Sequence, residues 1–316
     1  MARSSGWRNR RWLPCSLSVA AIGLTVAQPA HAADGSATLV VDGKTRSYAI
    51  HVPDRAPPLG GFPVILAFHG GGMQGQGMRR LTHLDSQADA RGVIIVYPDG
   101  LDRHWNDGRS TIRNPHDDVG FVSALLDRIG RDYRIDAGRV YATGISNGAL
   151  FAQRLGCDLS QRIAAIAPVA GSIPSDIADR CRLGRPLAVL EIGGTADPIM
   201  PFQGGPVATM GGAGEGGQVL SLADTVALWA RRNRCGLQDR PARLPPVAPL
   251  DRTRILRMTY QNCPAAGRVQ VLTVAGGGHS WPGGMQFSLP RVIGLTSRQI
   301  DASSAIVDFF LSLPPR

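Results

Sequence analysis

The chain has 316 residues, 43% of them hydrophobic, which is enough to bury one large core. Its 39 glycines and 23 prolines follow no period, and this excludes collagen-like and solenoid folds. The formal net charge is +10, but the basic residues are dispersed. The tightest basic group, Arg231, Arg232 and Arg234, ends a predicted helix, where cations stabilise the helix dipole, so we expect no nucleic-acid partner.

Residues 1–32 are predicted to be a secretory signal peptide. A basic start precedes an apolar run, residues 13–26, and Ala30-His31-Ala32 matches a small-x-small cleavage site. A buried N-terminal helix is the alternative, because the apolar run is too short to span a bilayer. We therefore expect a secreted protein, periplasmic or extracellular, whose residues 33–316 form a single domain without a membrane segment.

Apolar runs typical of strands alternate with stretches whose apolar residues recur at helical spacing. The first two strands form a predicted hairpin, with Asp42-Gly43-Lys44 as its turn. Because nearly all later strands are apolar throughout, they predict a mostly parallel central sheet covered by helices on both faces, an α/β fold. The expected strands are 37–41, 46–52, 63–68, 92–97, 139–143, 163–169, 187–192 and 269–274, and the expected helices are 78–91, 119–133, 149–155, 222–233 and 300–313.

The residues Gly144-Ile145-Ser146-Asn147-Gly148 fit the pattern G-x-S-x-G. The pattern alone is a weak signal, because glycine and serine are common enough for it to occur by chance. Its context is more specific, since it follows a predicted strand and precedes a predicted helix, as a nucleophile elbow requires. We therefore expect Ser146 to be a catalytic nucleophile, with the backbone N–H of Asn147 beside the developing oxyanion. An ordinary strand-to-helix turn is the alternative.

A serine nucleophile needs a base and an acid that orients the base, in the chain order Ser, acid, His. His279 is the one histidine of seven that follows Ser146, and it comes just after a predicted strand. Asp197 closely follows the predicted strand 187–192, whereas Glu191 lies inside that strand, where its side chain would face the wrong way. We expect His279 as the base and Asp197 as the acid. The alternatives are a surface histidine in a glycine-rich loop and an ordinary turn aspartate.

The loop after the third predicted strand reads His69-Gly70-Gly71-Gly72. Glycine lets backbone N–H groups approach a substrate closely, so we expect Gly71 or Gly72 to join Asn147 in the oxyanion hole. His69 is expected to be a structural hydrogen-bonding group rather than a second base.

Trp105 and Trp281 are candidate walls of the substrate pocket, because aromatic side chains near a catalytic loop can stack on a sugar or an aromatic acid. Ordinary core packing is the alternative for each. The glycine-rich segment 203–217 lies between the expected acid and the expected base along the chain. It is therefore either a loop over the site or a surface insertion.

Four cysteines remain once residues 1–32 are removed, and an even number in an exported chain predicts two disulfides. Three pairings are possible, and the most local one is preferred over the others and over four buried thiols. The preferred pairs are Cys157 with Cys181 and Cys235 with Cys263. No cysteine or histidine spacing typical of a metal site occurs, and His116, Asp117 and Asp118 fit a helix cap better than a metal site, so we expect no metal.

Six sequence blocks follow one another along the chain: HGGG at 69–72, YPDGL at 97–101, WNDGR at 105–109, GISNG at 144–148, GTADP at 194–198 and GHSWPG at 278–283. Together they resemble the polyhydroxybutyrate depolymerase and feruloyl esterase-like branch of the α/β-hydrolases, related to carbohydrate esterase family 1. The resemblance runs from about residue 38 to the C-terminus. It implies the α/β-hydrolase fold, a Ser-Asp-His esterase with no metal or organic cofactor, and two disulfides.

Many extracellular polyester depolymerases of this kind carry a linker and a substrate-binding domain after the catalytic domain, whereas this sequence stops at Arg316. Efficient attack on crystalline polymer is therefore not expected. Soluble oligoesters, and hydroxycinnamoyl or acetyl esters of plant polysaccharides, are the substrates that the resemblance leaves open.

The sequence thus predicts a secreted serine esterase that cleaves carboxylic esters in two steps through an acyl-enzyme. Two other functions stay open, namely a peptidase of the same fold and a non-catalytic binding protein with a hydrolase fold. The expected partner is an ester substrate, and the oligomeric state is left open.

Overall fold

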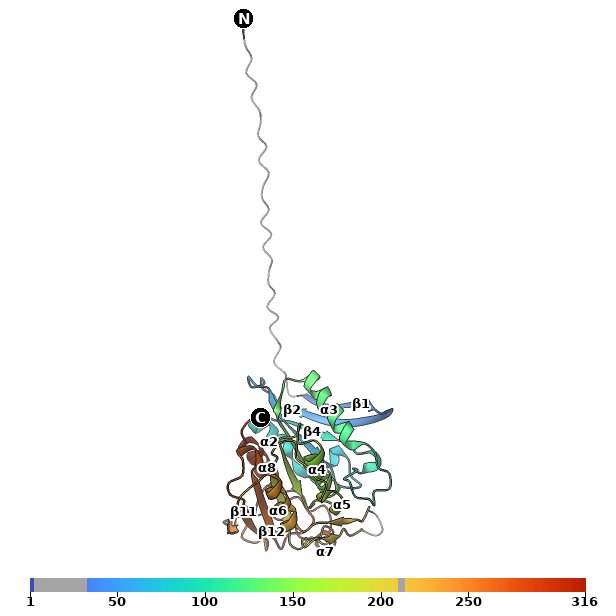
Figure 1. Cartoon of the computed structure of the whole chain (residues 1–316), viewed down its shortest axis with the longest axis vertical. Helices are drawn as coiled ribbons and strands as arrows, with labels where there is room; N and C mark the ends of the chain where they lie inside the picture. Colours follow the sequence, from blue (N-terminus) through green and yellow to red (C-terminus); the bar gives the residue numbers. More distant parts are fainter. Residues whose placement is uncertain (3–32, 210–213) are drawn as a thin grey trace.

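The computed structural model describes residues 1–2, 33–209 and 214–316 (Figure 1). The predicted signal peptide and its cleavage site therefore lie outside the described residues, apart from Met1 and Ala2. In the described part of the chain, no helix combines the length and the apolar character that crossing a membrane requires.

A sheet of ten strands forms the centre of the described structure, in the order β1-β2-β4-β3-β5-β6-β7-β12-β11-β10. The inner strands pair in parallel and are largely buried, which explains their continuous apolar sequences. They are β3 (Phe62–Phe68), β4 (Ile94–Pro98), β5 (Ile135–Ile145), β6 (Ala165–Val169), β7 (Ala188–Gly194) and β12 (Val269–Ala275). Antiparallel strands flank them, with β1 (Ala33–Val41) and β2 (Lys44–Val52) at one edge and β11 (Arg254–Thr259) and β10 (Ala242–Arg243) at the other.

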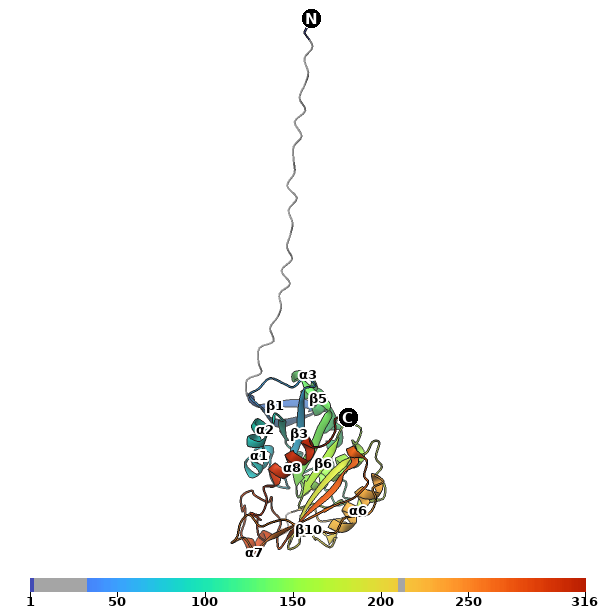
Figure 2. The same cartoon turned by 90° about the vertical axis from the view of Figure 1, so that its left-hand side faces the viewer.

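Helices cover both faces of the sheet, as the sequence predicts. The apolar sides of α3, α4 and α6 pack in one core cluster, and those of α1, α2 and α8 pack in a second. In Figure 2, α1, α2 and α8 lie on one side of the strands and α6 on the other. The helices are α1 (Gly75–Thr82), α2 (Leu84–Arg91), α3 (Asp118–Asp132), α4 (Asn147–Asp158), α5 (Ser175–Ala178), α6 (Leu222–Arg232), α7 (Pro290–Ile293) and α8 (Ala302–Leu311), and a small hairpin is formed by β8 (Gly205–Pro206) and β9 (Gln218–Val219).

The predicted helix 78–91 is wrong as one continuous element. His83 adopts a left-handed conformation with φ 50°, and its backbone N–H donates to the carbonyl of Arg79, so α1 ends there and α2 starts at the next residue. The apolar spacing runs through the break because Met78, Leu81 and Leu84 all face the same core cluster. Periodicity therefore located the buried face but not the change of direction.

Of the acidic pair at the start of α3, Asp117 has the capping role that the sequence predicts. Asp117 Oδ1 accepts a hydrogen bond from the Gly120 N–H at 2.8 Å and so caps the helix. Asp118 is buried and forms a 2.7 Å ion pair with the buried Arg46 of β2. The ion pair between Asp118 and Arg46 thus connects α3 to β2 of the sheet.

Both preferred disulfides are present. Cys157 is bonded to Cys181 and Cys235 to Cys263, over sequence separations of 24 and 28 residues. In the chain-entropy description each loop of this size contributes about 3 kcal/mol to stability. The first bond joins the last turn of α4 to the chain beyond α5, and the second joins the chain just after α6 to the segment before β12.

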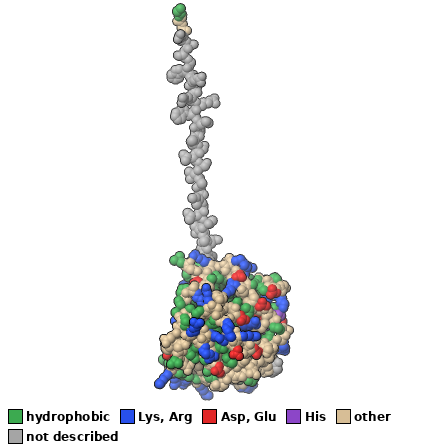
Figure 3. All heavy atoms as spheres, viewed as in Figure 1, with side chains coloured by type: hydrophobic (Ala, Val, Ile, Leu, Met, Phe, Trp, Pro, Cys, Tyr) green, Lys and Arg blue, Asp and Glu red, His purple; other side chains and the backbone are tan. Residues whose placement is uncertain are grey.

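On the face drawn in Figure 3, Lys and Arg side chains stand among acidic and apolar ones. Several of the arginines are paired with a carboxylate, among them Arg154 with Asp158 and Arg162 with Asp127. Ion pairs of this kind neutralise part of the positive charge of the protein locally.

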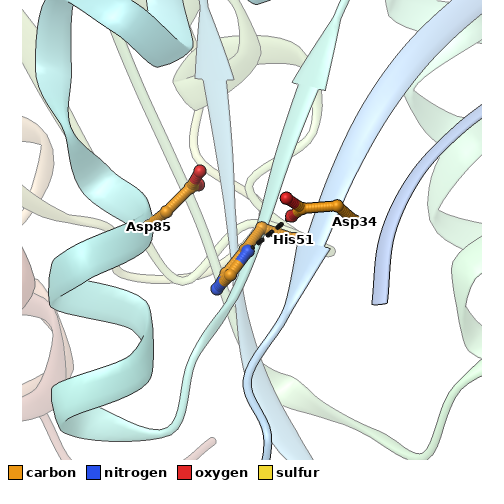
Figure 4. Close-up of side chains that lie close together, drawn as sticks. All are labelled: Asp34, His51 and Asp85. Atoms are coloured by element: carbon orange, nitrogen blue, oxygen red, sulfur yellow. Dashed lines mark hydrogen bonds and ion pairs between the residues drawn. The ribbon is translucent and has the colours of Figure 1, made fainter. Parts of the chain in front are cut away.

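A cluster of charged side chains ties the hairpin β1–β2 to the first two helices (Figure 4). His51 Nδ1 lies 2.8 Å from Asp34 Oδ1, and His51 Nε2 lies 2.8 Å from Asp89 Oδ1. Ligand atoms of Asp34, His51 and Asp85 lie within 4.8 Å of one another, as a metal site would need. Arg79, however, binds both Asp34 and Asp85, so the protein itself supplies the positive charge. We interpret the cluster as an ion-pair network.

This network predicts that the stability contributed by His51 falls as the pH rises. Burial lowers the pKa of His51, but hydrogen bonds to Asp34 and Asp89 and the nearby charge of Asp85 outweigh it, so the net pKa lies above 6.5. Folding then favours the protonated imidazole, whose contribution is complete below pH 6.5 and is lost as the pH rises through the raised pKa. The melting temperature of the wild type should exceed that of His51→Gln most between about pH 5 and pH 6.5, where the imidazole is protonated and its carboxylate partners are ionised, and the difference should shrink as the pH rises through the raised pKa of His51. A difference that stays constant or grows with pH would contradict this.

Candidate active site

Ser146 stands between the end of β5 and the start of α4 in a strained backbone conformation. Its φ is 58° and its ψ is −126°, a combination that costs a non-glycine residue about 1–3 kcal/mol. The strand and the helix can approach closely because both flanking residues are glycines. A Cβ on Gly144 would lie 2.5 Å from the Gly148 carbonyl oxygen, and a Cβ on Gly148 would lie 2.3 Å from that of Phe68. This is the geometry that a nucleophile elbow requires.

The glycine-rich loop after β3 forms a second side of the site. The N–H of Gly72 donates to the carbonyl of Arg103 at 2.9 Å, so it is already engaged. Within the described residues, the N–H groups of Gly71 and Asn147 have no hydrogen-bond partner, and both residues line the same cavity as Ser146. Of the two glycines that the sequence left open, the hydrogen bonding therefore favours Gly71.

His69 is fully buried under this loop. Its Nε2 accepts a hydrogen bond from the Gly100 N–H at 2.9 Å, and its Nδ1 lies 2.8 Å from the Gly70 carbonyl oxygen. Because the Gly100 N–H can only donate, the proton of His69 is on Nδ1 and Nε2 is an acceptor. Burial lowers the pKa of His69 to about 4. These contacts confirm that His69 is a structural hydrogen-bonding group.

Asp197 and His279 meet because they follow neighbouring parallel strands, β7 and β12. His279 Nδ1 lies 2.8 Å from Asp197 Oδ2, and both side chains are almost fully buried. The other carboxylate oxygen, Asp197 Oδ1, accepts the N–H groups of Ile199 and Met200, each at 2.8 Å. The carboxylate is therefore fixed from the backbone while it holds one nitrogen of the imidazole.

Ser146 and His279 line one cavity of about 460 Å³. Most of its wall is apolar, and the larger apolar side chains are Met73, Ile145, Leu150, Ile199, Met200, Val207 and Phe287. The glycine-rich segment 203–217 contributes Val207, Ala208, Gly214 and Glu215, on either side of residues 210–213, which lie outside the described residues. The described part of that segment thus belongs to the wall of the site.

The prediction that Trp105 and Trp281 wall the pocket is wrong, because both side chains are buried and neither lines the cavity of Ser146 and His279. The Trp105 ring packs edge-to-face on Phe68 and stacks on Phe151, at centroid distances of 5.1 and 5.0 Å. Its indole N–H donates to the His69 carbonyl at 3.1 Å. Trp281 donates its indole N–H to a buried serine hydroxyl of α8. Both rings pack inside the core, behind loops of the candidate site.

Two polar residues of the cavity wall, His104 and Arg109, were not predicted from the sequence. His104 lies beside Gly71, since a Cβ on Gly71 would lie 2.8 Å from His104 Nε2 and the imidazole would have to move aside. The Arg109 guanidinium forms a buried ion pair with Asp107 and donates to the carbonyl of Gly216. Arg109 and Asp107 belong to the sequence block WNDGR, which was the one available signal for them.

Known proteins that are similar to this chain show which family it belongs to. No family model matches the chain. Over 281 residues, the chain is 36% identical to the protein named "Putative esterase NocK" of Nocardia uniformis subsp. tsuyamanensis, covering 86% of this chain and 81% of that protein. The chain belongs to the esterase family of the α/β-hydrolases. This esterase is therefore a carboxylic ester hydrolase, and the predicted fold class and enzyme class are confirmed.

The esterase is also similar to a feruloyl esterase and, in its fold, to an acetyl xylan esterase. It is 29% identical to "Feruloyl esterase B" of Piromyces equi over 212 residues. The matched region covers 63% of this chain but only 37% of that protein. The "Acetyl xylan esterase from Aspergillus awamori" superposes with a TM-score of 0.56 over 78% of this chain and 94% of that chain, at 13% identity, a likeness that shows the fold alone. The resemblance to feruloyl esterases is confirmed, and the one to polyhydroxybutyrate depolymerases stays a prediction.

Proposed function

We propose that the protein is a secreted serine esterase in which Ser146 is the nucleophile, His279 the base and Asp197 the acid that orients it. The hydrogen bond of 2.8 Å between Asp197 and His279, at the wall of the cavity that also holds Ser146, is the observation that carries this proposal. Secretion is supported by the predicted signal peptide and by two disulfides, which persist in oxidising compartments.

In this mechanism the Asp197 carboxylate accepts the Nδ1–H of His279, which leaves Nε2 without a proton and able to take that of the Ser146 hydroxyl. The serine oxygen attacks the ester carbonyl, whose oxygen becomes an oxyanion. The N–H groups of Gly71 and Asn147 stabilise that charge, and each such donor contributes roughly 3 kcal/mol to lowering the barrier. Protonated His279 then gives its proton to the departing alcohol, which leaves the acyl group on Ser146. In the second step His279 takes a proton from water, the water oxygen attacks the acyl carbonyl, and His279 returns the proton to the Ser146 oxygen as the acid leaves.

The charges of the cavity wall are already neutralised within the protein. Arg109 is paired with Asp107, and Glu215 is paired with Arg113 at 3.2 Å. The remaining wall is mainly apolar, and a cavity of about 460 Å³ is much larger than an acetyl group needs. We therefore propose uncharged, bulky acyl esters of the hydroxycinnamoyl type as preferred substrates, with acetyl esters and hydroxybutyrate oligomers as poorer ones.

A substrate panel tests this proposal. We expect a higher kcat/KM for methyl ferulate than for acetylated xylan or hydroxybutyrate oligomers, and no faster turnover of amino-acid anilides, which a peptidase would prefer. The nearly isosteric pair p-nitrophenyl butyrate and p-nitrophenyl hemisuccinate isolates the effect of charge. The hemisuccinate should be turned over at least roughly tenfold less efficiently, because the described residues of the cavity wall offer its buried carboxylate no unpaired cation. Equal turnover of the two esters would contradict the proposed preference for uncharged groups, and anilides hydrolysed faster than esters would contradict the esterase mechanism.

A further inference from the structure

We infer that Asp107 is a positioning residue, which holds the side chain of Asn147 and thereby aims the Asn147 backbone N–H at the substrate carbonyl oxygen. The inference rests on the proposed function, because it concerns the oxyanion of the Ser146 reaction. It adds a residue outside the expected Ser-Asp-His set, from a segment that the sequence assigned to no catalytic role.

The side chain of Asn147 is completely engaged. Its Oδ1 accepts the N–H of Trp105 at 2.8 Å, while its Nδ2 donates to the carbonyl of Trp105 at 3.0 Å and to Asp107 Oδ2 at 2.7 Å. Both amide protons and the amide oxygen are thus used, which leaves this side chain a single orientation. Asn147 is 5% exposed, so water does not replace these partners.

Asp107 is in turn fixed by Arg109. Asp107 is fully buried, and its Oδ2 accepts from Arg109 Nη2 at 2.7 Å while its Oδ1 accepts from Arg109 Nε at 2.9 Å and from the Arg109 N–H at 3.1 Å. The guanidinium also donates to the carbonyl of Gly216 in the outer wall. A buried two-point pair of this kind is rigid, and it offers Asn147 an acceptor with a fixed position.

Trp105, whose backbone is the other partner of the Asn147 side chain, is also held in place. The Trp105 backbone, which pairs with the Asn147 amide, belongs to a residue whose ring is held between β3 and α4 by Phe68 and Phe151. Asn147 is the first residue of α4, so its N–H has no partner within the helix and points out of the helix end. The preceding residue, Ser146, has an unfavourable φ, so the peptide between them would relax if the side chain of Asn147 were released.

Asp107 accepts hydrogen bonds from two side chains, those of Asn147 and Arg109, and a carboxylate suits this arrangement better than a neutral amide. Asp107 must accept from Asn147 and from Arg109 together, and a carboxylate oxygen has the lone pairs to do both, whereas a neutral amide would offer one oxygen and turn a donor toward one of them. Removing the carboxylate therefore frees Asn147 Nδ2 and leaves the Arg109 guanidinium buried without its counter-charge.

The test compares Asp107→Ala, Asp107→Asn, Asn147→Ala and the double variant Asp107→Ala/Asn147→Ala on p-nitrophenyl butyrate. We expect kcat to fall about 100-fold for Asp107→Ala and about 10-fold for Asp107→Asn, with KM within about twofold, because a small misplacement of an oxyanion donor lowers only the rate of the chemical step. Affinity for a trifluoromethyl ketone, which forms a tetrahedral oxyanion on the serine, should fall in proportion to kcat. The double variant should be no slower than Asn147→Ala, because Asp107 acts through Asn147.

Leu125→Ala is the matched control for lost stability, because Leu125 is fully buried in α3 and does not line the cavity. It should lower the melting temperature and leave kcat unchanged. If Asp107→Ala does not fold, Asp107→Asn, which preserves the size of the side chain, decides the question. Unchanged kcat in Asp107→Asn, a loss confined to KM, or losses that multiply in the double variant would each overturn the inference. Full activity of Ser146→Ala would instead overturn the proposed function.

Discussion

Replacement of Ser146 by alanine should lower kcat by about 10⁴- to 10⁶-fold while the protein keeps its fold and its melting temperature. The reason is chemical, since without the hydroxyl no acyl-enzyme forms, and only the oxyanion donors and the binding of the ester accelerate attack by water. The side chain is partly exposed and has no hydrogen-bond partner among the described residues, so its loss removes no structural contact.

Kinetics on p-nitrophenyl butyrate measure this loss, and labelling by a fluorophosphonate probe reports the same hydroxyl directly. The probe should label the wild type and not Ser146→Ala. Ser123→Ala is the control, because Ser123 accepts a hydrogen bond from Arg162 and does not line the cavity. It should retain both labelling and activity. A wild-type protein that hydrolyses esters but is never labelled, or a Ser146→Ala variant that is, would exclude Ser146 as nucleophile.

Gly148→Ala should abolish activity and destabilise the protein by several kcal/mol, although it adds only one methyl group. The added Cβ would lie 2.3 Å from the carbonyl oxygen of Phe68 and 2.5 Å from that of His69, both of them backbone atoms. The start of α4 would have to move away from β3, and this movement would carry Ser146 and the Asn147 N–H away from Gly71. Thermal melting and kcat together measure the effect.

Gly130→Ala is the matched control for this substitution. Gly130 also lies in a helix, but a Cβ there would meet only the side chain of Ile135, at 3.6 Å, which is an ordinary contact. Alanine should therefore raise the stability of α3 by about 0.5–1 kcal/mol through its better helix propensity, with no change in kcat. If Gly148→Ala and Gly130→Ala had the same melting temperature and the same kcat, the turn at Ser146 would not depend on the close approach of Gly148 to β3.

The placement of Ser146, Asp197 and His279 could be predicted from sequence because each follows an apolar strand of recognisable length. Parallel strands present their carboxyl ends at one edge of the sheet, so chain order and local pattern are enough to bring the three side chains to one edge. The two disulfides could be predicted for a similar reason, since both pairs are close along the chain. The preferred pairing is confirmed, whereas the catalytic roles stay a prediction.

The support of the site could not be read from the same patterns. The contact of Asp107 with Asn147 joins residues 40 positions apart, and nothing in either local sequence points to the other. Trp105 was mistaken for a pocket wall because a tryptophan near a catalytic loop looks alike whether its ring faces the ligand or the core, and only the packing partners separate the two. The break at His83 was missed because the buried faces of α1 and α2 coincide.

The helix α4, which begins directly after Ser146, is held at both of its ends. Its first residue follows the elbow, and its last turn carries Cys157, which is bonded to Cys181. A preparation made in a reducing cytosol would keep the glycines that shape the elbow and lose the covalent tie one helix length away. Such a preparation should remain active when cold and inactivate at lower temperature than material folded under oxidising conditions, so the production host becomes an experimental variable.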